Sequence, residues 1–274
     1  MTQCPIFTLL QNENNSCYLD SILFAMLHDP KSPTCRFLTK LNPKQDTPNV
    51  QRIMAELNTI AATFQTKTRH SLAPLRKLLQ KSQHGSINWT HEQIEPLDFL
   101  IFIQDIFKVR NCLQFREEVR SENKVVTSHT IRSPFVDIVN GTSPVNLRNI
   151  YPIRVSKETF DSPLWRHKYK ERIETRTLLS CSKFLMVHVT RLSDGATKST
   201  EKVTPLSKIT MAKEITLRAI IVHHGSSNGG HYTCLYKCGR KWYEFDDMES
   251  GPHTIVKDVK RDYYLKNATD FIYW

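Results

Sequence analysis

The hydrophobic pattern changes its period near residue 110, and this change constrains the fold more than any other feature of the sequence. Before it, apolar residues recur every three or four positions, as on one face of a helix. After it they alternate or form short β-branched runs, as in strands. The expected helices cover about 16–29, 50–64, 71–79 and 96–107. The expected strands cover about 125–126, 135–139, 184–192, 215–224, 231–236, 241–245 and 271–274.

This order of helices followed by strands predicts an α+β architecture. The chain has no internal repeat and no low-complexity segment, so we expect residues 1–274 to form one domain. Within it, a helical lobe would cover about 1–110 and a sheet lobe about 111–274. The cleft between the two lobes is the expected place for a functional site.

The composition is that of a globular protein, with 39% hydrophobic and 24% charged residues in 274, which excludes disordered and fibrous classes. The apolar run 97–107 contains Asp98, Gln104 and Asp105 and is shorter than the roughly 20 residues of a membrane span. The first residues lack the basic and apolar regions of a secretory signal. We therefore expect no membrane span and an intracellular location, cytoplasmic, nuclear or both.

The seven cysteines are an odd number without an export signal, which favours reduced thiols over a disulfide framework. Cys234 and Cys238 form the only close pair. They are separated by three residues and have no second pair to complete four ligands, so a zinc site is not expected. We expect neither a metal nor a cofactor.

A polar turn, Asn12-Glu13-Asn14-Asn15-Ser16, precedes Cys17 at the start of the first amphipathic helix. A thiol at a helix N-terminus lies against unpaired N–H groups and the positive end of the helix dipole, which favours the thiolate. Position alone would make Cys17 reactive, but a cysteine nucleophile also needs a base with an orienting acceptor.

A second polar segment supplies both groups. His231 follows the glycine pair Gly229-Gly230, and Asp246 ends the next expected strand. If the turn lies near 238–240, the two strands pair antiparallel and the start of one faces the end of the other. An Asp246 carboxylate could then hold the imidazole of His231.

These two segments resemble the cysteine and histidine boxes of the ubiquitin-specific proteases, a family of deubiquitinating cysteine proteases. The run Asn-Ser-Cys-Tyr-Leu-Asp-Ser at 15–21 is most similar to the cylindromatosis branch of that family. Weaker similarities at 93–100, 184–192 and 270–274 extend the resemblance over nearly the whole chain. It implies a papain-like fold with a helical thumb, a β-sheet palm and a finger-like extension.

The resemblance also implies the catalytic roles. Cys17 would be the nucleophile, His231 the general base and acid, and Asp246 the acceptor that orients His231, a role that Asp247 could share. Asn12 lies where the family places a side-chain donor to the oxyanion. Preorganised donors of this kind are typically worth about 10²–10³ in rate each.

The implied reaction is hydrolysis after the C-terminal glycine of ubiquitin. Glu95 and Asp98 match acidic positions that hold the substrate tail, whose arginines would pair with carboxylates. Gly229 and Gly230 would let the loop before His231 close over the tail, with Tyr232 packed beside the histidine. Glu95 and Asp98 could equally serve the dipole of their own helix.

The chain departs from the family pattern in two respects. The stretch 115–137, which matches the family's fingers, contains no cysteine, so the fingers are expected to be short and free of zinc. Position 20 is Asp where much of the family has Asn. The cylindromatosis branch shares the Asp, so this residue is not read as inactivating.

Three alternative functions stay open at this point. The substrate could be a ubiquitin-like modifier such as SUMO, NEDD8 or an ISG-type protein. The chain could be a non-catalytic ubiquitin-binding module, although every position needed for chemistry is filled. The net charge of +11 also admits weak electrostatic contact with nucleic acid, but no aromatic residues are interleaved in the basic clusters in the manner of a nucleic-acid site.

Overall fold

The structure is a computed structural model that describes residues 10–66, 69–82, 87–92, 94–108, 113–121, 124–133, 136–139, 164–169, 172–181, 183–193, 197–200, 202–210 and 214–274. The chain divides into two compact units. The first comprises Met1–Val109 and Gly229–Lys257, and the second comprises Arg110–Asn228 and Asp258–Trp274. The division of the chain into a thumb and a sheet lobe at about residue 110 stays a prediction.

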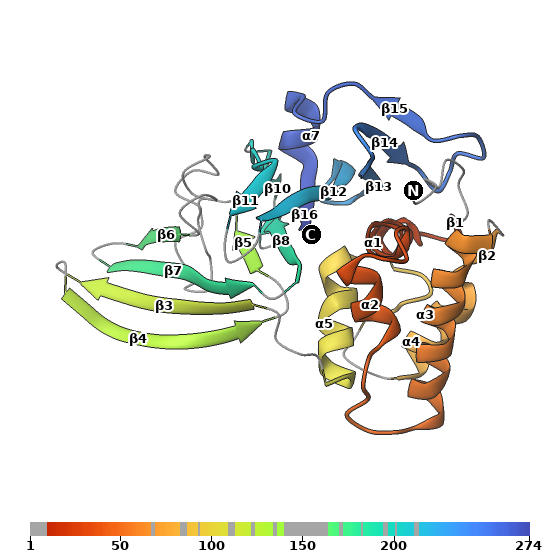
Figure 1. Ribbon diagram of the computed structural model, residues 1–274, viewed down its shortest axis with the longest axis horizontal. Helices are drawn as coiled ribbons and strands as arrows, with labels where there is room; N and C mark the ends of the chain where they lie inside the picture. The colour runs from red at the N-terminus through yellow and green to blue at the C-terminus, as the bar shows by residue number, and fades with distance from the viewer. Residues whose placement is uncertain are drawn as a thin grey trace. The chain divides into compact units, whose positions relative to one another are not determined.

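The described part of the first unit contains five helices (Figure 1). They are α1 (Cys17–Leu27), α2 (Pro33–Thr39), α3 (Pro48–Thr66), α4 (Ala73–Lys81) and α5 (Pro96–Ile106). Proline at the first or second position begins α2, α4 and α5, where its missing N–H costs nothing. Helix α2, absent from the sequence prediction, is capped by the Ser32 hydroxyl, which accepts from the Cys35 N–H at 2.9 Å.

The first unit also contains a hairpin of β13 (Gly229–Cys238) and β14 (Lys241–Phe245), with β15 (Thr254–Val256) paired to β14. All three strands are antiparallel, and Cys238 faces Lys241 across the turn. Gly239 lies in that turn with φ 61°, a conformation open to glycine without a Cβ penalty. The hairpin predicted from the sequence is therefore confirmed. Two short strands, β1 (Leu10–Gln11) and β2 (His70–Ser71), pair in parallel.

The core of the first unit joins α1 to this hairpin. Every residue of α1 is buried, and the helix packs on β13. Phe24 stacks on Phe245, with ring centroids 4.2 Å apart, and meets Tyr236 edge-on at 4.9 Å. A helix buried on all sides needs apolar partners around its whole circumference, and α2, α3 and α5 provide the others.

The second unit is built on a sheet of strand order β12 (Glu214–Ser226), β16 (Ala268–Tyr273), β8 (Leu185–Thr190) and β5 (Val136–Val139). Strand β11 (Lys208–Thr210) also pairs with β12. Helix α7 (Asp262–Asn267) packs on β12. Buried Arg191 donates to the carbonyls of Ala268 and Leu265, both at 2.9 Å. The second unit also contains a short antiparallel pair, β9 (Leu192–Ser193) and β10 (Thr197–Lys198), and a second sheet.

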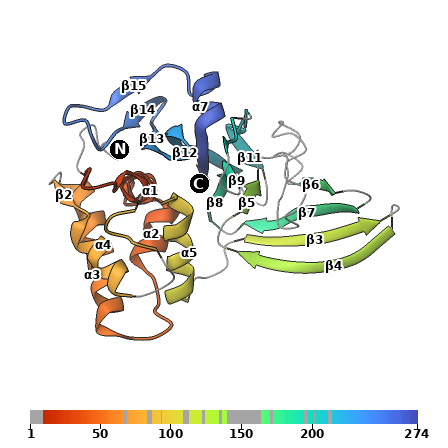
Figure 2. The same cartoon turned by 180° about the vertical axis from the view of Figure 1, so that it is seen from behind.

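That second sheet has four strands in the order β4 (Lys124–Ser133), β3 (Leu113–Ser121), β7 (Arg172–Cys181) and β6 (Leu164–Tyr169), all antiparallel (Figure 2). From the sequence, the fingers were expected at about 115–137 alone. Two strands from 164–181 extend this sheet beyond that stretch. They were not predicted, because the alternation of apolar and polar residues there is too irregular to identify strands from one sequence.

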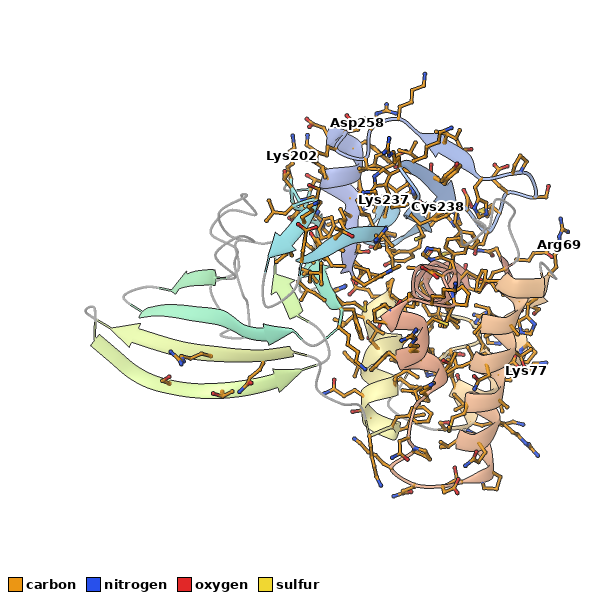
Figure 3. The ribbon with its side chains drawn as sticks, in the orientation of Figure 1. Arg69, Lys77, Lys202, Lys237, Cys238 and Asp258 are labelled. Atoms are coloured by element: carbon orange, nitrogen blue, oxygen red, sulfur yellow. The ribbon has the colours of Figure 1, made fainter. Side chains whose placement is uncertain are left out.

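Cys17, Cys35 and Cys234 are free thiols. Cys238, labelled in Figure 3, lies at the end of β13 and is joined in a disulfide bond. The expectation that all cysteines are reduced is therefore wrong for Cys238. Cysteine spacing along the chain does not report which sulfur atoms meet in the fold. Within the described ranges, no helix is both long and apolar enough to cross a bilayer.

Candidate active site

The polar turn before Cys17 takes two residues into the left-handed region of backbone space. Asn14 has φ 49° and Asn15 has φ 63°, and asparagine is one of the few residues with a side chain that adopts this conformation readily. The Ser16 hydroxyl closes the turn by accepting the Glu13 N–H at 2.8 Å. The carbonyl of Ser16 then accepts the N–H groups of Leu19 and Asp20 in α1, at 2.8 and 2.9 Å.

Arg76 of α4 holds this turn from the protein interior. Its side chain is 3% exposed, and its guanidinium donates to the carbonyls of Glu13, Asn14 and Trp89. One rigid fork thereby fixes two successive carbonyls of the turn. Arg76 was not predicted from the sequence, because nothing in the pattern of α4 distinguishes a buried arginine from an exposed one.

The turn delivers Cys17 as the first residue of α1, where it is 3% exposed. This is the position expected from the sequence. The N–H groups of Cys17 and Tyr18 have no acceptor within the helix, and the positive end of the helix dipole lies at Cys17.

His231 and Asp246 meet across the β13–β14 hairpin. His231 Nε2 donates to Asp246 Oδ1 at 2.8 Å, and the same oxygen accepts the Met248 N–H at 2.9 Å. His231 also hydrogen bonds the side chain of Cys17. Because Nε2 is engaged by Asp246, Nδ1 is the ring nitrogen left for the sulfur.

The surroundings of His231 favour its charged form. Burial by itself lowers the pKa of His231. The hydrogen bonds to Asp246 and Cys17, with the charges of Asp246 and Asp247, outweigh this effect and raise the pKa to about 10. Opposite charges at short range favour an imidazolium in this way.

Asn12 is fixed by Asp247. The Asn12 side-chain amide donates to Asp247 Oδ2 at 2.9 Å, and the Asn12 backbone N–H donates to the Asp247 carbonyl at 3.2 Å. Asp247 is 3% exposed, and its Oδ1 lies 3.5 Å from His231 Nε2. An amide NH₂ carries two donors, so Asn12 keeps one N–H for another acceptor.

All five of these side chains belong to the first unit. The structure therefore brings together Asn12, Cys17, His231, Asp246 and Asp247, which the sequence analysis selected from segments more than 200 residues apart. The sequence profile of the family described as "Ubiquitin carboxyl-terminal hydrolase" matches residues 8–273. The chain belongs to this family.

Relatives and a solved structure agree with this assignment. The chain is 23% identical to mouse ubiquitin carboxyl-terminal hydrolase 17-like protein B and 24% identical to 17-like protein E, over 93% of its own length in both cases. It spans 62% and 54% of those two proteins. In fold it resembles the SAGA DUB module of Ubp8, Sgf11, Sus1 and Sgf73 bound to monoubiquitin, with a TM-score of 0.61 and 15% identity. That match covers 96% of this chain and 68% of the other.

The candidate substrate-binding residues of this chain lie at two places. Glu95 and Asp98 are half-buried at the start of α5, and Asp98 Oδ2 accepts the Glu95 N–H at 3.0 Å. Asp98 thus caps its own helix. Gly229 and Gly230 are exposed at the start of β13, where Gly229 has φ 156°, and Tyr232 is buried.

His231, Asp246 and Asp247 bring possible ligand atoms to within 4.8 Å of one another. The His231 Nε2 that faces both carboxyl groups is already the donor to Asp246, and a protonated nitrogen does not bind a metal. We therefore assign these three residues to hydrogen bonding and not to a metal ion.

Proposed function

We propose that this chain hydrolyses the isopeptide or peptide bond after the C-terminal glycine of ubiquitin, by a thiol mechanism. The observation that carries the proposal is the contact of Cys17 with His231, which is in turn hydrogen bonded to Asp246. A nucleophile, a base and an orienting acceptor in series form the arrangement of cysteine hydrolases. The family and the solved relative bound to monoubiquitin support ubiquitin as the substrate.

In this mechanism the Cys17 thiolate attacks the scissile carbonyl and forms a tetrahedral oxyanion. The free N–H of the Asn12 amide and the backbone N–H of Cys17 donate to that oxygen. The His231 imidazolium then protonates the leaving amine as the C–N bond breaks and the thioester forms. The neutral imidazole next takes one proton from water as the water oxygen attacks the thioester. The C–S bond then breaks, which releases the thiolate and the ubiquitin carboxylic acid, and this acid loses its proton to solvent.

We further propose that the substrate tail is bound by Glu95, Asp98, Gly229 and Gly230, with Tyr232 supporting the histidine. The raised pKa of His231 supports this chemistry at neutral pH, because the ring must carry a proton when the amine leaves. The division into thumb, palm and fingers is proposed on the family resemblance.

The test is intact-mass detection of an adduct between the protein and ubiquitin that carries a thiol-reactive C-terminal group. Wild type is expected to form one adduct, and Cys17→Ala none. Cys35→Ala is the matched control, because Cys35 is also a buried free thiol of the first unit and is expected to leave the adduct unchanged. An adduct that persists in Cys17→Ala contradicts the proposal.

Probes built on SUMO, NEDD8 and ISG-type modifiers are run beside the ubiquitin probe. A reaction confined to one of these modifiers would retain Cys17 as the nucleophile and overturn ubiquitin as the substrate. Failure of all probes with folded wild-type protein would overturn hydrolysis and leave a non-catalytic binding function.

A further inference from the structure

A second carboxyl group lies beneath the site. Asp20, in the first turn of α1, is 0% exposed, and its side chain is in hydrogen-bonding contact with that of Asp247. Among the residues that the structure describes, no N–H group donates to Asp20 Oδ1, Asp20 Oδ2 or Asp247 Oδ1. A proton shared between the two carboxyl groups would satisfy Asp247 Oδ1 and one oxygen of Asp20, and the Ser16 hydroxyl is the donor available to the other Asp20 oxygen. Two carboxylates would instead repel one another.

The groups that face this pair decide which carboxyl carries the proton. Asp247 Oδ2 accepts the Asn12 amide at 2.9 Å, and Oδ1 lies 3.5 Å from the His231 ring. Asp20 has beside it the Ser16 hydroxyl and the acidic side chains of Cys17 and Tyr18. Asp247 therefore has a donor and a positive ring on one side and the Asp246 carboxylate on the other, whereas Asp20 has one donor, the Ser16 hydroxyl, and otherwise only acidic neighbours.

The electrostatics agree with this allocation. Burial raises the pKa of Asp20 well above its usual range, and Asp247 raises it further. Burial also raises the pKa of Asp247, but the hydrogen bond from Asp20, the charge of His231 and the Asn12 amide all act to lower it. When two buried acids interact so closely, the pair binds one proton over a wide pH range.

We propose that Asp20 is a positioning residue of the active site, a neutral carboxylic acid whose O–H donates to Asp247 and so fixes the carboxylate that holds Asn12 and faces His231. This inference rests on the proposed function, because it assigns Asp20 to the support of the oxyanion donor. A neutral Asp20 also avoids placing a second buried negative charge beside the Cys17 thiolate.

The first test compares Asp20→Asn with Asp20→Ala in steady-state cleavage of a ubiquitin C-terminal fluorogenic substrate. Asparagine keeps the shape and supplies an N–H donor to Asp247 without charge, so its kcat is expected to stay within about threefold of wild type. Alanine removes the donor and is expected to lower kcat about tenfold or more with little change in KM. This loss approaches the decrease in kcat that is typical when one oxyanion donor is removed. Equal losses in both variants would overturn the proposal.

The second test needs no substrate. Carboxyl-carbon NMR of the free protein, with Asp20→Asn to assign the signal, is expected to show Asp20 protonated at pH 7. An Asp20 signal that titrates near the ordinary value of about 4 would overturn the proposal. If wild type leaves ubiquitin uncleaved, the proposed function fails, and this measurement still decides the protonation of Asp20.

Thermal unfolding supplies an independent readout, also informative if Asp20→Ala does not fold. A carboxyl whose pKa is raised in the folded state contributes its full stability below its unfolded pKa of about 4 and loses it as the pH rises towards the folded pKa. The Tm of Asp20→Asn is therefore expected to gain on wild type as the pH rises from about 4 to 8. A constant Tm difference would contradict a protonated Asp20.

Discussion

The rings of Phe24 and Phe245 lie parallel, with an angle of 5° between their planes and centroids 4.2 Å apart. Phe24 is on α1, which begins at Cys17, and Phe245 directly precedes Asp246. One stacked pair therefore ties α1, which carries Cys17, to β14, which directly precedes Asp246, the acceptor for His231. Packing of this kind fixes distances that hydrogen bonds alone would leave adjustable.

Phe24→Ala is expected to lower the free energy of unfolding by about 3–5 kcal/mol, the range for truncation of a buried phenylalanine. Loss of the stack should also reduce kcat, because α1 can then move relative to β14. Chemical denaturation followed by tryptophan fluorescence measures the stability. Ile101→Ala, at a side chain that is 41% exposed on α5, is the control and should change little.

Arg76→Met is expected to loosen the turn before Cys17, since it removes the donors to the carbonyls of Glu13, Asn14 and Trp89. Each buried acceptor left without a donor costs about 1–3 kcal/mol. Lys77→Met, at an exposed position of the same helix (Figure 3), is the matched control. Similar melting temperatures for the two variants would show that the turn holds without Arg76.

Asn12→Ala is expected to reduce kcat by about 10²–10³, the typical loss for one oxyanion donor. The KM for ubiquitin substrates should change little, because the developing negative charge exists only in the transition state. Steady-state kinetics separate the two constants. A rise in KM at constant kcat would place Asn12 in ground-state binding instead.

Asp246→Ala is expected to lower kcat by about 10²–10⁴, the range attributed to general acid–base catalysis. His231 would lose the acceptor at 2.8 Å that fixes its ring. Binding of ubiquitin, measured by calorimetry in a Cys17→Ala background, should be nearly unchanged. Comparable losses in binding and turnover would instead indicate a structural role for Asp246.

The pH dependence of activity should reflect the raised pKa of His231. With that pKa at about 10, kcat/KM is expected to persist from neutral into alkaline pH and to fall as the pH rises through about 10. In Asp246→Asn the fall should move to lower pH, because the hydrogen bond and charge that raise the pKa are lost. A wild-type fall near pH 7 would contradict this prediction.

The protonation of His231 should also make the stability of the fold depend on pH, with the stabilisation lost as the pH rises and not as it falls. The stabilisation that His231 gains from its acidic neighbours is fully present below its unfolded pKa of about 6.5 and is lost as the pH rises through about 10. His231→Gln should therefore lower Tm more at pH 6 than at pH 10. An equal effect at both pH values would mean that the ring is neutral in the folded protein.

Much of the local structure follows from the sequence. Apolar spacing predicted α1, α3, α4 and α5 near their observed positions, since each buries one face or more. The β13–β14 hairpin was predicted from two strand-like segments, 231–236 and 241–245, with a short turn near 238–240 between them. Short α2, capped by Ser32, and strands β6 and β7 were missed. Their patterns are too short or too irregular to identify without the surfaces they pack against.

The sequence by itself determined which residue types stand at a helix N-terminus and at the two ends of a hairpin, and so selected Cys17, His231 and Asp246. Only the tertiary structure decided the surroundings of these groups. The hydrogen bond from Asn12 to Asp247 spans 235 positions, and Arg76 reaches the turn from α4. The fold likewise decides that Asp20 is buried against Asp247 and that His231 is charged, because both depend on which side chains pack together and exclude water. Desolvation and long-range contact arise only when distant segments pack, and local sequence patterns do not record them.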